Sequence, residues 1–374
     1  MSNSQISAGV ANAKEPRSFF EKQLAGERPL SFETAEELYQ LAINLSEVQP
    51  WEMLDDQEFI LMQDPQSKEI CYCSVLGGLG MVFAVHVYVG AESYFFMRRL
   101  MSRNSTAPSD FYGTLRGVMV EYVQAREQTP PDRELLAACG RPTKRGGRAP
   151  IFRAFRPGYN PWYITEGEGR LLAFCLRGVL AFCTDESEAS CVDHWKEEDI
   201  FPLLVPVRDD ASRQRFEIRS VKAPDPPTGR PQAVRLDDGQ INEILQKDYI
   251  RQGSLEADHL FAIGEIGRKN ERKACLSAAI VCDGDSGFAF QPELGQPGEP
   301  AGVLLVRAIL GAIRDAQAVP IEIRVQKQEF RFMLEALSEK LGIAVRVKKS
   351  LPALNFFRKG LLAHIGDPGE IQID

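Results

Sequence analysis

The sequence lacks the features that identify a membrane protein, a common zinc protein or a nucleotide hydrolase. No apolar run approaches the roughly 20 residues that span a bilayer. There is no CxxC pair, and the GxSxG, HExxH and Walker-type phosphate-loop patterns are absent. We therefore expect neither a membrane-spanning protein nor an enzyme of these hydrolase classes.

No composition extreme points to a fibrous or wholly disordered chain. The 374 residues are 44% hydrophobic and 26% charged, which are ordinary globular values. This length suggests about two domains. The net charge of −8 favours solubility and disfavours indiscriminate binding of nucleic acid or anionic lipid. We expect no membrane partner.

Cysteine is present but not in a disulfide or metal pattern. The eight cysteines are Cys71, Cys73, Cys139, Cys175, Cys183, Cys191, Cys275 and Cys282. We expect reduced thiols and a cytoplasmic location, because the chain is large and its N-terminus is polar. Cys191 and His194 form the one metal-like spacing, but structural zinc needs four ligands. We therefore expect no metal and no cofactor.

One proline-rich stretch divides the chain. The segment VKAPDPPTGRPQ holds four prolines and a glycine, a composition typical of a linker. We predict a loosely ordered tail over 1–28, an N-terminal domain over 29–222, a linker over 223–232 and a C-terminal domain over 233–374.

The N-terminal domain shows mixed helix and strand patterns. Thr34 followed by Glu37, and Thr165 followed by Glu168, are two candidate capping boxes at helix starts. Between them, residues 70–89 read as two strands around a glycine-rich turn. The fold class is therefore predicted to be α+β in this domain.

The C-terminal domain has a clearer order of elements. Strands are expected at 260–266, 275–282, 288–291, 321–325 and 343–347, and helices from 299, over 330–341 and over 351–364. This βββαβαβα order resembles the ribonuclease H-like fold of ribonucleases H, retroviral integrases and many transposases. The resemblance implies two-metal phosphodiester cleavage. It also implies one acid on the first strand, another on or near the first helix or fourth strand, and a third on the last helix.

The acids that this resemblance implies are mostly missing. Glu265 could serve on the first strand, but the fourth strand ends in Val325-Gln326-Lys327, and the last helix, LPALNFFRKGLLAH, has no carboxylate. We expect a C-terminal domain without nuclease activity. The alternative is a divergent metal-dependent nucleic-acid-processing enzyme that uses Glu265, Asp283 and Asp285.

Most of the chain is also similar to a group of bacterial proteins with the same two-part layout. The segment RPGYNPWYIT carries this resemblance in the N-terminal domain, and VPIEIRVQKQEFRFMLEALSEKLGIAVRVKKSLPAL carries it near the C-terminus. The resemblance supports the division into two domains and implies no activity.

A basic, aromatic segment is the main candidate binding site. No acid occurs between Glu134 and Glu166. The candidate ligand-binding residues there are Arg141, Lys144, Arg145, Arg148, Arg153, Arg156 and Trp162. Cations beside aromatics suit a phosphorylated ligand or single-stranded nucleic acid. Alternatively, the acid-rich stretch 185–199 neutralises this segment within the same domain.

A second basic zone lies near the C-terminus. It comprises Arg324, Lys327, Arg331, Arg346, Lys348, Lys349, Arg358 and Lys359. If the domain has the expected fold, some of these side chains share a surface, although a solvated charged face is the simpler interpretation. The sequence as a whole predicts a non-catalytic binding or adaptor protein that recognises a protein partner or a phosphate-bearing ligand.

Overall fold

The structure is a computed structural model. It describes residues 18–101, 113–144, 146–184, 200–208, 214–225, 233–268 and 271–365. Within these ranges, no helix is both long enough and apolar enough to cross a bilayer. Most of the expected linker, residues 226–232, lies outside them. The limits 29–222 and 233–374 therefore remain predictions.

Seven strands form one sheet in the N-terminal part. They are β3 (Ile60–Gln63), β4 (Ile70–Leu76), β5 (Ala84–Val89), β6 (Gly117–Gln124), β7 (Arg148–Phe155), β8 (Ile200–Arg208) and β9 (Gln214–Lys222). Their order in space is β7-β6-β5-β4-β3-β8-β9. Neighbours are antiparallel except β3 and β8. The predicted hairpin over 70–89 is confirmed by β4 and β5.

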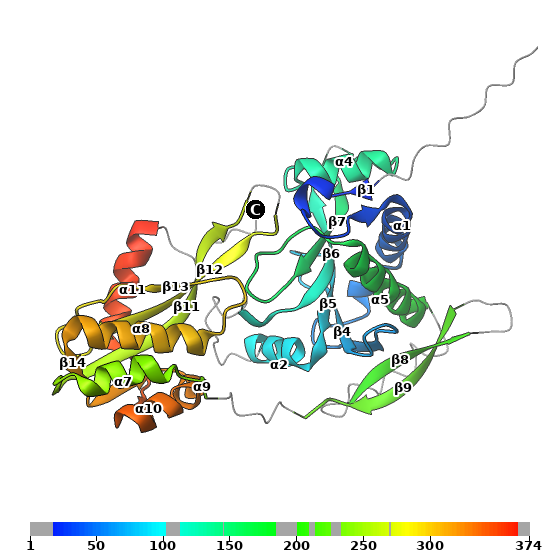
Figure 1. The fold of residues 1–374 in the computed structure, drawn as a ribbon. Coiled ribbons are helices and arrows are strands. Elements are labelled where there is room, and N and C mark those ends of the chain that lie inside the picture. Colours follow the sequence, from blue (N-terminus) through cyan, green and yellow to red (C-terminus); the bar gives the residue numbers. More distant parts are fainter. Residues whose placement is uncertain are drawn as a thin grey trace, which may run out of the picture.

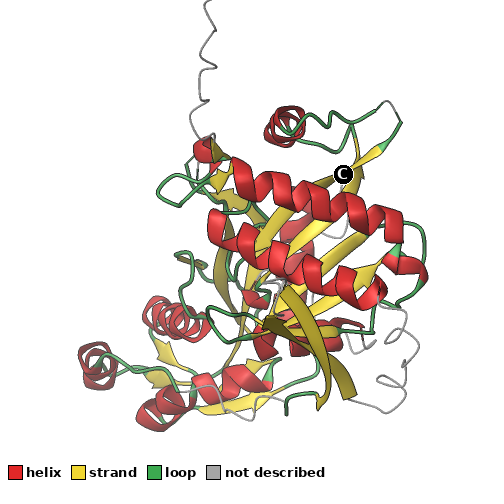
Figure 2. Ribbon diagram, turned by 90° about the vertical axis from the view of Figure 1, so that its right-hand side faces the viewer, coloured by secondary structure: helices red, strands yellow, loops and turns green. Residues whose placement is uncertain are grey.

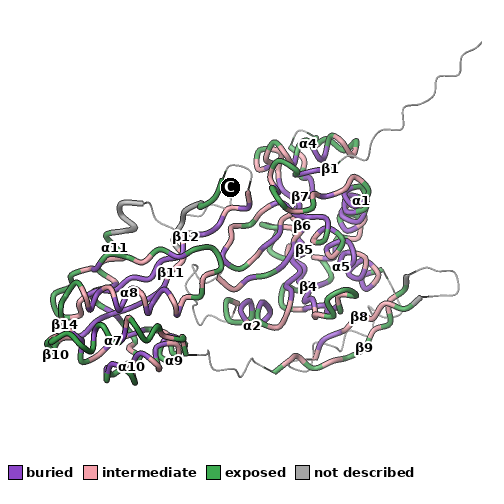
Figure 3. The backbone as a smooth tube through the Cα atoms, in the orientation of Figure 1, coloured by how far each residue is buried: buried purple, intermediate pink, exposed green. Residues whose placement is uncertain are grey.

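Helices cover both faces of this sheet. The helices are α1 (Phe32–Val48), α2 (Gly90–Met101), α4 (Pro130–Ala138) and α5 (Glu166–Thr184), and short elements are β1 (Ser18–Phe19), η1 (Glu21–Gln23), β2 (Leu30–Ser31) and η2 (Pro50–Glu52). Figure 2 shows α1 and α5 side by side over one face. Alternation along β4 turns Cys71 and Cys73 toward α5 and Tyr72 toward α2. The core therefore has two layers, one on each side of the sheet (Figure 3).

The two expected capping boxes have different outcomes. The one at Thr165 is confirmed, because Thr165 N donates to Glu168 Oε2 at 2.8 Å and Glu168 N donates to Thr165 Oγ1 at 3.3 Å. The one at Thr34 is wrong. Ser31 caps α1 by accepting from Thr34 N, and the Thr34 hydroxyl donates to Glu166 Oε1 at 3.0 Å. Thr34 thus joins the starts of α1 and α5.

The C-terminal part contains a second sheet. Its elements are α7 (Asp238–Gln246), β10 (Ile250–Arg251), β11 (Ser254–Ile266), β12 (Ala274–Asp283), β13 (Glu293–Gly295), α8 (Ala301–Ala316), β14 (Ala318–Val319), β15 (Glu322–Val325), α9 (Gln328–Met333), α10 (Glu335–Leu341), β16 (Ala344–Val347) and α11 (Pro352–Ile365). The sheet order is β13-β12-β11-β15-β16. The first three strands are antiparallel, and β15 and β16 run parallel to β11. This arrangement confirms the predicted ribonuclease H-like fold.

Three details of this part differ from the sequence-based expectation. The first strand begins at Ser254 rather than at 260, the third strand lies at 293–295 rather than 288–291, and the helix expected over 330–341 is divided into α9 and α10. The early start of β11 matters most. It brings Glu256 and Asp258, which interrupt the apolar pattern, into the sheet.

The two faces of the second sheet are covered by different helices. Leu255 and Ala257 pack with α8, whereas Ile280 and Cys282 pack with Leu354 of α11. Because side chains alternate along a strand, Glu256 and Asp258 face α11. Figure 1 shows α8 and α11 on the two sides of the β11–β12 hairpin.

The tip of this hairpin contacts the N-terminal part. Asn160 N donates to Lys273 O at 2.8 Å, and Cys275 N donates to Gly158 O at 3.0 Å. Next to these bonds, the side chain of Arg272 is 4% exposed and lies near Glu27 and Glu168. The two parts are thus joined by backbone hydrogen bonds and a buried guanidinium.

Candidate functional site

Arg153 of the basic segment is a packing residue. Its guanidinium donates to both carboxylate oxygens of Asp132, at 2.8 and 2.6 Å, and lies 5.0 Å from the ring centre of Tyr163. Asp132 is buried and is also part of the α4 capping box with Thr129. This two-pronged bond joins β7 to the start of α4.

Arg156 and Trp162 are also engaged inside the protein. Arg156 pairs with Glu27 at 2.6 Å and with Glu168 at 2.8 Å. The indole Nε1 of Trp162 donates to Gln23 O at 2.7 Å. The charge of Arg156 is therefore neutralised within the protein by Glu27 and Glu168. The stretch 185–199 lies outside the described residues.

The exposed members of the segment lie before and at the start of β7. Arg141 Nη2 donates to Gln40 Oε1 at 2.9 Å, and the Arg148 guanidinium lies 4.9 Å from the ring centre of Phe83. Lys144 is exposed, and Arg145 lies outside the described residues. Among the described members of the segment, Arg141, Lys144 and Arg148 are therefore the ones accessible to a ligand, and binding at them stays a prediction.

A cavity of about 480 Å³ adjoins Arg156. The cavity lies at the amino end of α5, and three of the residues that line it are Arg116, Arg156 and Arg170. Each forms an ion pair, Arg116 with Glu69 and Arg170 with Glu166, both at 2.8 Å. Because their charges are already compensated, this cavity has no strong preference for anions.

The second basic zone is partly assembled by the fold. Arg324 of β15 and Arg346 of β16 are direct cross-strand partners. Glu322 Oε1 lies 2.8 Å from Arg324 Nε and 3.7 Å from Lys348 Nζ, and Glu322 Oε2 lies 3.1 Å from Arg346 Nε. Its bond to Arg324, with help from the other two cations, holds the pKa of Glu322 below the usual value. One carboxylate thus serves three cations.

A salt bridge occupies the face on which a nuclease of this fold would hold its acids. The carboxylate of Asp258 bonds to the guanidinium of Arg358 on α11 and accepts from His259 N at 2.8 Å. Glu256 Oε2 accepts from Leu354 N, at the start of α11, at 3.1 Å. Both acids are almost fully buried. A guanidinium and a helix amide therefore take the places that a divalent cation would need.

The acids of the alternative enzyme do not converge. In the β11–β12 ladder, Glu265 pairs with Cys275 and Leu255 pairs with Asp283. Those ladder positions are eight residues apart on β12, or about 27 Å at the usual rise per strand residue. Among the described residues, no group of three or more His, Cys, Asp or Glu side chains is placed to hold a metal. Glu265, Asp283 and Asp285 thus cannot share one metal ion.

Sequence reasoning missed Asp258 and Glu256 as the acids nearest the expected catalytic position. The alternation signal was available, because Leu255 and Ala257 flank them on the apolar face. The metal-like pair Cys191 and His194 lies outside the described residues.

Comparisons with known proteins match two separate stretches of the chain. Residues 36–202 match the family described as Domain of unknown function (DUF7309), and residues 240–362 match Domain of unknown function (DUF6930). The search of curated proteins finds no match.

One solved structure is similar to part of the chain. It is the HTLV-2 integrase catalytic core domain in complex with magnesium, at 14% identity over 33% of this chain and 79% of that chain, with a TM-score of 0.21. The fold assignment therefore depends on the strand order of this chain itself. Two separate stretches of the chain are thus similar to domains of unknown function, and the second stretch has the strand order of a ribonuclease H-like fold.

Proposed function

We propose that this chain is a binding protein that recognises a phosphate-bearing ligand without cutting it. The observation that carries the proposal is the salt bridge between Asp258 and Arg358. A metal-dependent nuclease needs free carboxylate oxygens at that position to hold its cations. Here the first-strand acid is neutralised by a cation from the last helix, so the domain keeps the fold and loses the metal chemistry.

The cations on β15 and β16 supply the binding surface in this proposal. Arg346 and Lys348 have side chains 63% and 41% exposed, and Glu322 offsets only one of the three positive charges around it. Arg324 and Arg346 are opposite each other with Glu322 paired to both, so the more exposed Arg346 and Lys348 are the cations that this surface offers to an anion. Phosphate groups are the common anions that arginine recognises.

Phe356 on α11 is an exposed aromatic side chain of the same part of the chain. Its side chain is 79% exposed, and α11 covers the same face of the sheet on which Glu256 and Arg324 lie. An aromatic beside cations suits single-stranded nucleic acid, because bases stack on rings while phosphates bind cations. The cytoplasm of a bacterial cell is the proposed location, in keeping with the seven described cysteines, which are all free.

Fluorescence anisotropy with labelled single- and double-stranded DNA and RNA tests the binding. We expect binding that weakens as salt is raised, since phosphate binding releases counterions. The double variant Arg346→Glu/Lys348→Glu should abolish it. The control Lys247→Glu/Lys340→Glu makes the same change of charge just after α7 and on α10 and should leave binding intact.

Two results would contradict the proposal. Absence of binding even at low salt removes the ligand class. Cleavage in Mg²⁺ or Mn²⁺ that disappears in Asp258→Asn removes the non-catalytic assignment. A third variant, Arg141→Glu/Arg148→Glu, compares the N-terminal candidate surface. If it alone abolishes binding, the ligand binds the basic segment instead of β15 and β16.

A further inference from the structure

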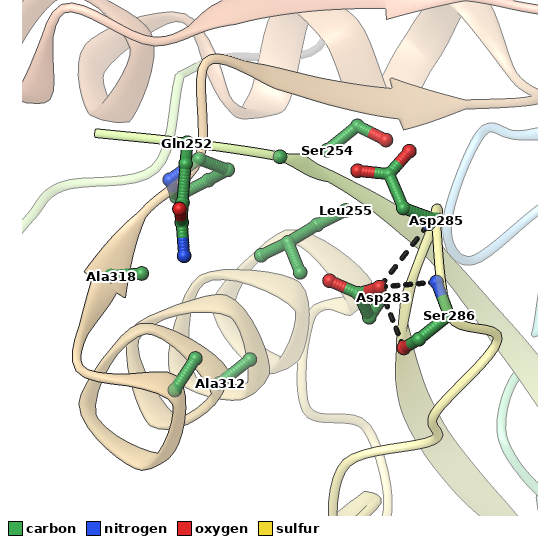
Figure 4. A pocket seen from close by; sticks show the side chains of 11 residues that line it. Gln252, Ser254, Leu255, Asp283, Asp285, Ser286, Ala312 and Ala318 are labelled. Atoms are coloured by element: carbon green, nitrogen blue, oxygen red, sulfur yellow. Dashed lines mark hydrogen bonds between the residues drawn. The ribbon is translucent and has the colours of Figure 1, made fainter. Parts of the chain in front are cut away.

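A cavity of about 450 Å³ at the amino end of β11 is compensated by the chain itself. Figure 4 shows Asp283, which lines it, accepting from the backbone N–H and the hydroxyl of Ser286. Asp285 lies in the field of Arg324, because the hydrogen bond to Glu322, together with the charges of Glu322 and Asp285, raises the pKa of Arg324. Both acids of the cavity therefore have partners within the chain.

The edge of the N-terminal sheet is open at β9. This strand is the last in the sheet order, and among the described strands it is hydrogen-bonded to β8 alone. It pairs with β8 at nine positions without a register shift, and its sequence, QRFEIRSVK, contains no proline. Edge strands of natural proteins are commonly short, bulged or interrupted by proline, because a regular edge pairs readily with another strand. β9 carries charged side chains but has none of these three protections.

The outer half of the β8–β9 hairpin lacks a third strand. β3 pairs with β8 at Leu203 and Leu204, and beyond Leu204 the described part of this sheet consists of β8 and β9. Figure 1 shows the hairpin, in green, at the margin of the N-terminal part. A two-stranded hairpin is marginal in water, and three or more strands are needed for independent stability. A further strand beside β9 would therefore stabilise it.

The charges of β9 are complementary to themselves. Glu217 and Arg219 lie on one face of the strand, on either side of Ile218, with side chains 53% and 57% exposed. Within one chain, Arg219 Nη2 lies 3.2 Å from Glu217 Oε2. Two antiparallel copies of β9 with Ile218 opposite Ile218 would set Glu217 of each copy opposite Arg219 of the other. Opposite charges in facing positions stabilise a pair of strands.

The other face of β9 favours the same register. Ile218 is half-buried and is the cross-strand partner of the buried Leu204 on β8. The two Ile218 side chains would therefore meet between two Leu204 side chains and form an apolar row across four strands. Centring the pair on Glu217 or on Arg219 instead would set like charges opposite each other. Centring it on Phe216 would leave residues 219–222 of each copy unpaired.

We propose that two copies of this chain associate through β9, antiparallel and about a two-fold axis at Ile218, to form a continuous β8-β9-β9-β8 sheet. Such an interface uses the same surface of both copies, as two-fold dimers do, and the backbone groups of the open edge supply its hydrogen bonds. One pair of strands is a small interface, so the dimer should dissociate on dilution. The association does not involve β15 or β16 and is independent of the proposed phosphate binding.

Sedimentation velocity of the full chain, over a roughly hundredfold range of concentration, tests the proposal. We expect a reversible equilibrium between monomer and dimer. Arg219→Glu sets acid opposite acid at two symmetric positions and should weaken dimerisation about tenfold. Glu217→Arg sets cation opposite cation and should weaken it by a similar factor. The control Arg126→Glu makes the same change of charge at a side chain that is 78% exposed after β6, and should leave the dimer intact.

A mixture of the two single variants gives the sharpest comparison. Glu217→Arg and Arg219→Glu, each checked for folding by circular dichroism, should associate with each other although each associates poorly with itself, because every facing pair is again opposite in charge. The double variant Glu217→Arg/Arg219→Glu should dimerise like the unmodified chain. A chain that stays monomeric at the highest concentration would overturn the proposal. So would a dimer that neither single variant weakens, or single variants that fail to associate when mixed.

Discussion

Arg358 on the last helix bonds to Asp258 on the first strand of the C-terminal sheet. The fold thus keeps an acid where the first catalytic carboxylate of a nuclease would be expected, and places a cation at the facing helix position. Glu256, two residues earlier, is used in a different way, as an acceptor for the amide of Leu354. Both buried carboxylates now hold α11 against the sheet, which is a structural role.

Removing the cation of this pair should destabilise the protein. Arg358→Ala leaves Asp258 buried without a compensating charge, and loss of one partner of such a pair costs about 3 kcal/mol. Urea unfolding followed by circular dichroism measures the change. Lys359→Ala, an exposed neighbour on the same helix, is the control and should alter stability by less than about 0.5 kcal/mol.

A double variant distinguishes charge compensation from simple packing. In Asp258→Asn/Arg358→Met no charge remains buried, so most of the stability should return. A double variant that is as unstable as Arg358→Ala would show that the salt bridge is not the reason for the loss.

Arg272 is expected to couple the two domains. Its guanidinium is buried near Glu27 and Glu168 of the N-terminal part, and burial lowers its pKa. Arg272→Ala leaves the two acids with Arg156 as their shared cation, so docking of the hairpin tip should weaken. Differential scanning calorimetry should then show two separate unfolding transitions, or two transitions whose midpoint temperatures lie further apart than those of the unmodified chain.

The neighbouring Lys273 provides the matched control for this test. Among the described residues, its Nζ donates to two carbonyls of its own hairpin, those of Gly267 and Arg268. Lys273→Ala should therefore leave the calorimetric profile unchanged. An unaltered profile for Arg272→Ala would mean that the backbone hydrogen bonds at Asn160 and Cys275 are sufficient.

Local patterns predicted elements but not their partners. The order of strands and helices in the C-terminal domain followed from alternation and helical spacing. The capping box of Thr165 and Glu168 could be predicted because its signal lies within four consecutive residues. By contrast, Ser31 rather than Thr34 caps α1, because the Thr34 hydroxyl is engaged by Glu166, 132 residues away. No local signal records such a contact.

The candidate site was less predictable for the same reason. Charge composition identified the basic segment, but only tertiary structure shows that Arg153 and Arg156 are paired with Asp132 and Glu168. The sequence pattern did not place Asp258 within a strand, because an acid next to an apolar run has the same local signal as the end of a strand. Its neutralising partner is 100 residues further along the chain.

Gly117 is required for the close approach of β5 and β6. A Cβ at this position would lie 2.3 Å from the carbonyl oxygen of Val87, and backbone cannot move aside as a flexible side chain can. Gly117→Ala should therefore lower the free energy of unfolding by about 1–3 kcal/mol, as measured in urea. Gly78→Ala, where a Cβ would meet nothing within 4 Å, is the control. Equal stability of the two variants would contradict the expectation.

His86 should make the N-terminal domain sensitive to acid. Its ring stacks on Tyr88, with centres 4.2 Å apart, and burial lowers its pKa to about 3. The unfolded chain binds a proton here near pH 6.5, so stability present above that pH is lost as the pH falls toward 3. The loss is about 1.4 kcal/mol per pH unit, or about 2 kcal/mol between pH 6.5 and pH 5.

A variant without the imidazole isolates this contribution. His86→Phe keeps a ring beside Tyr88 and Phe155, and Nε2 has no hydrogen-bond partner among the described residues to lose. Urea unfolding at pH 7 and pH 5 should show that the unmodified chain loses about 2 kcal/mol more than the variant. Carboxylates titrate alike in both proteins, so the difference reports His86 alone. Equal losses would mean that the buried imidazole is protonated in the folded state.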